Sequence, residues 1–298
     1  MTARPRRVMG PADPPVFVVG APRSGASFLY KLLCLHPDST WVSNWVGRRP
    51  YLGPLASLNR LAARAHRMRH SAWFRSDDRT PLARAFPRPV ESGSLFSAYD
   101  VPEASDAVEA TRRQTSLRRA VGDLARFGGG RVFVSRQAAH GRRLPLLHAI
   151  FPRARIVVVH RDGRAVAESL SRTDWWPGSH VWWFGDTPLA WEEKGGDPWD
   201  LCARHWVREV EAIEHGLARL PSAAVLHVRY EDFTADPAAT LDGVGEFVGM
   251  PAGRRWRRAV GRVDLPVADD GWRARLGSAA ARVEDVQAGW LRKYEYLS

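Results

Sequence analysis

The stretch "VFVVGAPRSGAS", from Val16 to Ser27, joins a run of apolar β-forming residues to a turn that contains two glycines. It satisfies most of the phosphate-loop pattern G-x-x-x-x-G-K-[ST], with Gly20, Gly25 and Ser27 in place, but Ala26 stands where the lysine belongs. Glycines let a backbone curl closely around an anion, and the helix that follows offers free N–H groups at its positive end. The stretch therefore predicts an anion site in an α/β fold, without the lysine that nucleotide triphosphatases use.

Other apolar runs suit strands that are buried on both faces of a parallel sheet. They cover residues 131–135, 155–160 and 224–230. Helical spacing of apolar residues predicts helices between the strands, at 27–36, 54–68, 103–128, 163–172, 201–220 and 237–249. This alternation predicts a doubly wound, mainly parallel sheet flanked by helices, the three-layer α/β architecture of P-loop NTPases. We expect a disordered leader over residues 1–14 and a single domain over residues 15–298.

The chain has 298 residues and a net charge of +12, and nearly all of its 44 basic residues are arginine. Such a charge favours anionic partners, so a basic nucleic-acid-binding protein is one alternative. The arginines are dispersed, however, and no DNA- or RNA-binding motif occurs, so we expect no nucleic-acid partner. No apolar run is long enough to span a membrane, and Cys34 and Cys202 have neither metal-site nor disulfide-framework spacing. We expect a cytoplasmic protein without a metal site.

A second polar motif follows a predicted strand in "FPRARIVVVHRDGRAVAESLSR", residues 151–172. Arg161 comes at the carboxyl end of the strand, and Ser169 lies eight residues further on, in the following helix. At 3.6 residues per turn the two side chains are about 80° apart, so they reach roughly the same side. Because arginine supplies charge and serine a directed hydrogen bond, this pair can bind a phosphate.

The two motifs together resemble those of sulfotransferases that use 3′-phosphoadenosine 5′-phosphosulfate (PAPS). The 5′-phosphosulfate loop of that family typically reads P-[KR]-S-G-T-T. The residues that match it are Pro22, Arg23, Ser24, Gly25 and Ser27, and Ala26 departs at the first threonine. The spacing of Arg161 and Ser169 resembles the family's 3′-phosphate site, with Gly163 where proline is usual. Since a phosphosulfate has no γ-phosphate, the resemblance also explains the missing lysine.

Two later segments agree with the resemblance. "VRYEDF", residues 228–233, resembles the family's late strand, and "DDGWRARL", residues 269–276, resembles its nucleotide-closing segment. Tyr230 would then lie beside the nucleotide, although a core tyrosine at a strand end is the alternative. The implied donor-binding residues are Arg23, Ser24, Gly25, Ala26, Ser27, Phe28, Arg161, Ser169, Tyr230, Trp272 and Arg273.

Sulfuryl transfer needs a base that takes the proton of the acceptor and a positive group for the leaving oxygen. Arg23, in the loop, is expected to stabilise the leaving charge. Candidates for the base are Glu91 and His140. The segment around His140 resembles the family's K-T-P-x-H stretch, with Arg136 at the lysine. Cytosolic relatives have a catalytic histidine two residues after that lysine, where this chain has Ala138, so both candidates stay open.

Five tryptophans fall within residues 174–191, a segment that proline and glycines interrupt. This composition predicts a loop or lid that walls an acceptor, with core packing under an insertion as the alternative. The resemblance implies a PAPS-dependent sulfotransferase that releases 3′-phosphoadenosine 5′-phosphate (PAP). Its acceptor would be a hydroxyl or amine of a small molecule, glycan or lipid. A P-loop kinase for a small metabolite is the alternative enzyme, and the oligomeric state stays open, a homodimer included.

Overall fold

Five parallel strands form the centre of the computed structural model, in the order β2-β3-β1-β4-β5. Their bounds are β1 Val16–Val19, β2 Ser39–Thr40, β3 Val132–Arg136, β4 Arg155–His160 and β5 Val225–Arg229. The structure describes residues 13–74, 80–265 and 271–297, so most of the predicted leader lies outside the described residues. The predicted parallel α/β sheet is confirmed, and the prediction missed only β2, which has two residues.

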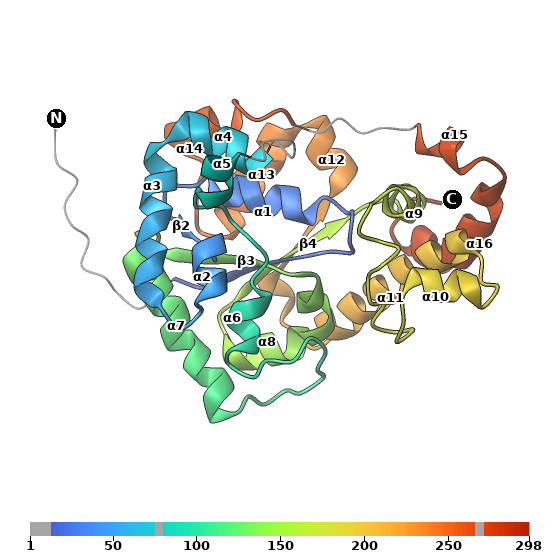
Figure 1. Ribbon diagram of the computed structural model, residues 1–298, viewed down its shortest axis with the longest axis horizontal. Helices are drawn as coiled ribbons and strands as arrows, with labels where there is room; N and C mark the ends of the chain where they lie inside the picture. The colour runs from blue at the N-terminus through green and yellow to red at the C-terminus, as the bar shows by residue number, and fades with distance from the viewer. Residues whose placement is uncertain (1–12, 75–79, 266–270, 298) are drawn as a thin grey trace.

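Alternate residues of β1 point to opposite faces of the sheet, because side chains along a strand alternate. Val16 and Val18 join one buried cluster, and Phe17 and Val19 join another. The first cluster packs under α1 (Ala26–Cys34), α12 (Tyr230–Ala235), α13 (Pro237–Phe247) and α14 (Arg254–Val260). The second packs under α6 (Gly93–Ser97), α7 (Arg112–Gly128) and α8 (Leu144–Ile150). Helices therefore cover both faces of the sheet, which gives three layers (Figure 1).

A third group of helices packs beside the sheet and not over it. It consists of α9 (Gly163–Ser171), α10 (Pro188–Glu193), α11 (Pro198–Leu217), α15 (Trp272–Leu276) and α16 (Ala280–Lys293). These helices share an apolar cluster of their own, and they form the right-hand part of the molecule in Figure 1. Residues 172–187 join α9 to α10, so this connection and α10 together carry the tryptophan-rich segment.

The remaining helices are short. They are α2 (Asn44–Arg48), α3 (Asn59–Arg64), α4 (His66–Phe74), α5 (Pro81–Ala85) and the 3₁₀ segments η1 (Gly53–Leu58), η2 (Ala138–Arg143), η3 (Ser222–Ala224) and η4 (Gly277–Ala279). The helix predicted over residues 54–68 is thus divided into η1, α3 and α4. No helix among the described residues has the length and apolar character needed to cross a membrane.

The helix predicted over residues 103–128 begins only at Arg112, as α7. Thr111 ends the preceding irregular segment by forming a capping box with Gln114. Its hydroxyl accepts from the Gln114 N–H at 3.2 Å, and its own N–H donates to the Gln114 side chain at 2.9 Å. Such a box satisfies two N–H groups that a helix start leaves free, which fixes the start of α7 at this point.

Candidate active site

The loop between β1 and α1 turns through two residues with left-handed backbone conformation. Arg23 has φ 68° and Gly25 has φ 92°. Arg23 is not a glycine, so its conformation stores about 1–2 kcal/mol of strain. A Cβ atom at Gly25 would lie 2.4 Å from the ring of Tyr230, so this close approach also requires glycine. The first hydrogen bonds of α1 come from the N–H groups of Phe28 and Leu29, which leaves the N–H groups before them available to an anion.

The two serines of the loop lie on different sides of it. The Ser24 side chain is buried beneath the turn, its hydroxyl has no hydrogen-bond partner, and its N–H donates to the Ala21 carbonyl at 3.1 Å. Ser27 is exposed and lines a cleft. Of the two hydroxyl groups predicted to bind the donor, the structure therefore brings only that of Ser27 to the open side.

Arg161 and Ser169, the pair predicted from the second motif, both contact Arg23. The Arg23 Nε donates to the Ser169 hydroxyl at 2.9 Å, and Arg161 donates to the Arg23 carbonyl at 2.9 Å. The pKa of Arg23 is lowered, first by burial and then by the positive charges of Arg161 and Arg172. The guanidinium groups of Arg23 and Arg161 thus lie close together at the N-terminus of α1, where an anion would offset their repulsion, while Arg172 is ion-paired with Glu168.

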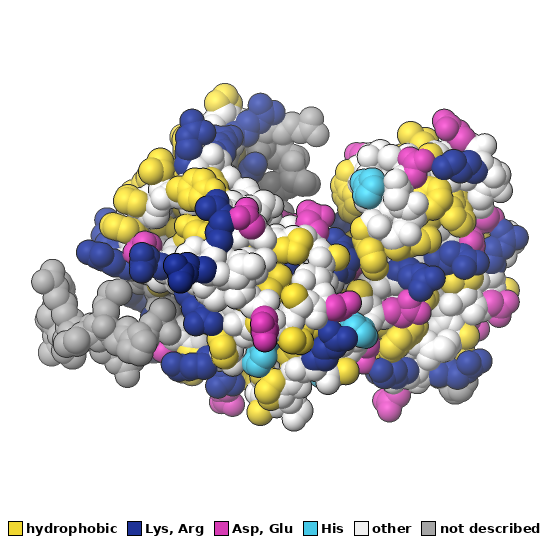
Figure 2. Space-filling view, turned by 90° about the horizontal axis from the view of Figure 1, so that it is seen from below, with side chains coloured by type: hydrophobic (Ala, Val, Ile, Leu, Met, Phe, Trp, Pro, Cys, Tyr) yellow, Lys and Arg dark blue, Asp and Glu magenta, His cyan; other side chains and the backbone are white. Residues whose placement is uncertain are grey.

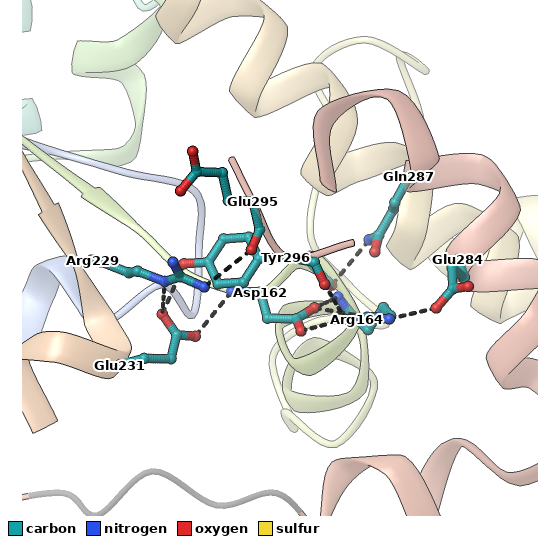
Figure 3. A network of polar contacts seen from close by, with 9 residues as sticks. Asp162, Arg164, Arg229, Glu231, Glu284, Gln287, Glu295 and Tyr296 are labelled. Carbon is teal, nitrogen blue, oxygen red and sulfur yellow. Dashed lines mark hydrogen bonds and ion pairs between the residues drawn. The ribbon is translucent and has the colours of Figure 1, made fainter. Parts of the chain in front are cut away.

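Arg161 is followed by residues that the C-terminal part of the structure holds in place (Figure 3). The Asp162 N–H donates to Glu231 at 3.1 Å, and the Tyr296 hydroxyl donates to the same carboxylate at 2.8 Å. Arg164 bonds to Asp162, to Glu284 and to the Tyr296 carbonyl. This network fixes the turn between β4 and α9, and so it positions Arg161 over the ring of Tyr230, 4.5 Å from the ring centre.

A cleft of about 690 Å³ opens at the carboxyl ends of the strands, where ligands bind in open α/β sheets. It is bounded by the β1–α1 loop on one side and by the tryptophan-rich segment on the other, and Figure 2 shows the surface hollowed between the two parts of the molecule. The predicted site residues that line it are Arg23, Gly25, Ala26, Ser27, Phe28, Glu91, Arg161 and Tyr230. Trp175, Trp176 and Trp182 line the opposite wall.

Glu91 lies at the edge of this cleft and forms an ion pair with Arg136, 3.1 Å between Oε1 and Nη1. The Arg136 side chain is only 4% exposed, and its Nε, which the ion pair does not use, has no hydrogen-bond partner. Burying an unsatisfied N–H group of an arginine is costly, so this group points to a ligand that completes its hydrogen bond.

The structure does not bring His140 to the cleft. Its ring is fully buried among Phe17 and Phe96, and its nitrogens bond to Ser135 at 2.8 Å and to Arg143 at 3.0 Å. Burial lowers the pKa of His140 well below its usual value, and the charge of Arg143 adds to this effect. The ring therefore belongs to the core on the α6–α8 face of the sheet, because η2 turns it inward directly after β3.

Trp272 and Arg273 also lie away from the cleft, on α15. Trp272 is buried in the third apolar cluster, where the guanidinium of Arg164 lies 5.2 Å from its ring centre. Arg273 is exposed and stacks on the same ring. Asp269 and Asp270, the first two residues of the predicted closing segment, lie outside the described residues.

The sequence analysis did not single out several polar residues that line the cleft, among them Arg142, His205 and Glu209. Arg142 donates to the Glu209 carboxylate at 2.6 Å, and Trp182 donates to the same oxygen at 2.8 Å. Burial raises the pKa of Glu209, and burial together with Arg142 lowers the pKa of His205 to about 3. The spacing of His205 and Glu209, four residues apart on the buried face of α11, was the signal available in the sequence.

Within the described parts of the chain, no three His, Cys, Asp or Glu side chains gather as metal ligands would. Arg23 and Arg161 bring positive charge to the loop.

Comparisons with known proteins agree with the fold. A sulfotransferase family model matches residues 14–254. Among solved structures, the sulfotransferase STF9 from Mycobacterium avium superposes with a TM-score of 0.60 at 16% identity, over 95% of this chain and 77% of that one. STF1 from Mycobacterium tuberculosis H37Rv gives 0.57 at 20% identity, over 93% and 77%. No curated protein sequence matches the chain. Because the family model spans most of the sequence and covers both motifs, the chain belongs to the sulfotransferase family.

Proposed function

We propose that this protein transfers the sulfuryl group of PAPS to a hydroxyl group of an acceptor and releases PAP. The observation that carries the proposal is the meeting of Arg23, Arg161 and Ser169 at the start of α1, in a loop that lacks the lysine of the triphosphatases. Membership of the sulfotransferase family weighs against the alternative of a P-loop kinase. Figure 2 gives no support to a nucleic-acid binder, since basic and acidic side chains are interspersed on the face that it shows.

The residues of the loop and of the segment after β4 suit a nucleotide that carries a 5′-phosphosulfate and a 3′-phosphate. The N–H groups at the start of α1 and the Ser27 hydroxyl would hold the 5′-phosphosulfate. Arg161 and Ser169 would hold the 3′-phosphate once their contacts with Arg23 are exchanged for contacts with the ligand. Tyr230 is buried between the loop and Arg161, and it would meet the nucleotide only where it lines the cleft.

PAPS supplies an activated sulfuryl group, so the protein needs to move one proton and stabilise one leaving oxygen. Glu91 would take the proton of the acceptor hydroxyl, whose oxygen then bonds to sulfur while the bond from sulfur to the phosphate oxygen breaks. Arg23 would meet the electron pair and negative charge that remain on that oxygen. The unpartnered Nε–H group of Arg136 would be available to a sulfuryl oxygen.

The direct test of this function uses PAPS and a metabolite extract, with products searched by mass for the gain of a sulfuryl group. We expect sulfated products that disappear when either PAPS or the protein is left out. An extract that gains phosphoryl groups from ATP, and no sulfuryl groups from PAPS, would instead establish the kinase. The proposal includes a cytoplasmic location, where PAPS is expected to be available and Cys34 and Cys202 stay reduced.

The protein is expected to bind PAP much more tightly than adenosine 5′-phosphate, because only PAP carries the phosphate that Arg161 and Ser169 would contact. Arg161→Ala should weaken PAP binding by about 2–4 kcal/mol, the usual loss when one partner of a desolvated charge pair is removed. Calorimetry with both nucleotides measures these differences. Arg153→Ala serves as the control, because Arg153 is exposed and lies just before the start of β4, at the other end of the strand from Arg161. Equal affinity of the wild-type protein for both nucleotides would contradict the assignment of the pair.

Sulfuryl transfer is expected to continue in EDTA at an unchanged rate, because Arg23 and Arg161 supply the charge that Mg²⁺ supplies to kinases. The measurement is the rate of PAP release with and without the chelator. A loss of turnover that added Mg²⁺ restores would favour the kinase.

A further inference from the structure

A second cavity, of about 580 Å³, lies directly beside the cleft. That volume falls within the range of small-molecule sites. Its walls come from residues 104–106, from the end of η2, from α11 and from Trp182 and Trp183. Arg142 and Trp182 line both the cleft and this cavity. A ligand that reaches from one to the other would therefore pass over these two side chains.

Burying the polar side chains of this shared wall costs free energy of folding. The guanidinium of Arg142 lies 5.1 Å from the ring centre of Trp182, and both side chains donate to one oxygen of Glu209. The Arg142 and Glu209 side chains are 9% and 1% exposed, and the Arg142 Nε and Glu209 Oε2 atoms have no hydrogen-bond partner. Buried ion pairs seldom increase stability, and unpaired buried polar atoms reduce it. The wall thus offers one donor and one acceptor to a ligand, at a cost that folding alone does not explain.

The charges around the second cavity compensate one another. Arg142 pairs with Glu209, and Arg208 pairs with Glu211 at 2.9 Å. The His215 ring lies 3.3 Å from Asp106. Every ionisable group that lines this cavity therefore has a partner of the opposite kind, so the cavity holds no unpaired charge to attract an anionic or cationic ligand.

We propose that the second cavity binds the distal part of the acceptor, and that the acceptor is a neutral polyhydroxylated molecule, a short glycan. This inference rests on the proposed sulfuryl transfer, whose reacting hydroxyl would lie in the cleft. Carboxylates, guanidinium groups and imidazole offer donors and acceptors to ring hydroxyls, while the indoles of Trp182 and Trp183 offer flat apolar surfaces to the C–H faces of a sugar. An alkyl chain would desolvate these charge pairs and would leave the Arg142 Nε and Glu209 Oε2 atoms without a partner, which disfavours a lipid.

The test compares neutral mono- and trisaccharides of glucose, galactose and mannose with 1-octanol and a hydroxy acid, each in the presence of PAPS. We expect at least one trisaccharide to be sulfated with a KM about tenfold or more below that of its monosaccharide. Calorimetry of the same trisaccharide with the PAP-bound protein gives a readout that does not depend on turnover. Sulfation of octanol or the hydroxy acid alone would overturn the inference.

A variant that places a larger side chain in the second cavity tests the distal site directly. Ala212 lines the second cavity but not the cleft, so Ala212→Trp should raise the KM for the trisaccharide about tenfold more than that for the monosaccharide. Ala218→Trp, an exposed site just after α11, is the control for folding and should leave both values unchanged. Equal effects of the two variants would overturn the distal site. Failure of the wild-type protein to bind PAP would instead refute the sulfuryl transfer itself, and with it the inference.

Discussion

Glu91→Gln is expected to lower turnover by about 10²- to 10⁴-fold while the affinity for PAP stays within about twofold. The amide keeps the size of the side chain and can still accept from Arg136, but it does not take a proton from the acceptor. Steady-state rates of PAP release give the turnover, with an acceptor identified by mass, and calorimetry gives the affinity. The melting temperature of the variant shows whether it is folded.

Two glutamates in the same cleft serve as comparisons for Glu91. Glu103 is largely exposed and lies 4.0 Å from Arg142, so Glu103→Gln should change turnover by less than about threefold. Glu209 is the other carboxylate of the cleft, and burial raises its pKa. If Glu91→Gln stays active and Glu209→Gln loses turnover without loss of stability, the base is Glu209, and the assignment of Glu91 is wrong.

Arg23→Ala is expected to lower turnover by about 10²-fold or more, as the loss of one donor to a developing negative charge does. Its guanidinium lies at the loop that would hold the phosphosulfate, and its Nε is oriented by Ser169. Nucleotide affinity should fall less than turnover does, because the charge on the bridging oxygen is greatest in the transition state. Turnover and PAP affinity are measured together, by PAP release and by calorimetry.

Backbone strain at Arg23 allows a sharper control. With φ 68°, this position suits glycine better than any side chain. Arg23→Gly removes the charge and relieves the strain, whereas Arg23→Ala removes the charge and keeps the strain. If charge is what matters, both variants lose turnover to the same extent. Activity retained by the glycine variant alone would show that the residue acts through the shape of the loop.

The sequence contained enough information for the sheet and for the anion loop, because both depend on local patterns. Continuous valine-rich runs indicated β1 and β4, and the spacing of Arg161 and Ser169 indicated a pair that the fold indeed brings to Arg23. The predicted start of α7 was wrong, because the capping box at Thr111 begins the helix within a sequence pattern that seemed continuously helical. Local side-chain chemistry decided that boundary, and apolar periodicity did not.

The buried polar group of Arg142, Trp182 and Glu209 was beyond the reach of local patterns. Arg142, Trp182 and Glu209 come from three separate elements, and only the packing of α11 beside η2 brings them together. His140 was a candidate because of its place after β3, but η2 turns its ring into the core. The orientation of a side chain after a strand depends on the next turn of backbone, which residue spacing alone does not specify.

The network around Arg164 has a consequence for how the protein is made. Residues 16–27 are synthesised early, whereas Glu284, Gln287 and Tyr296, which hold the turn beside Arg161, are among those made late. A ribosome adds about 5–20 residues per second, so these late residues are synthesised on the order of tens of seconds after the loop. The turn that carries Arg161 therefore lacks these contacts until the late residues emerge, and until then the nascent chain depends on its apolar core.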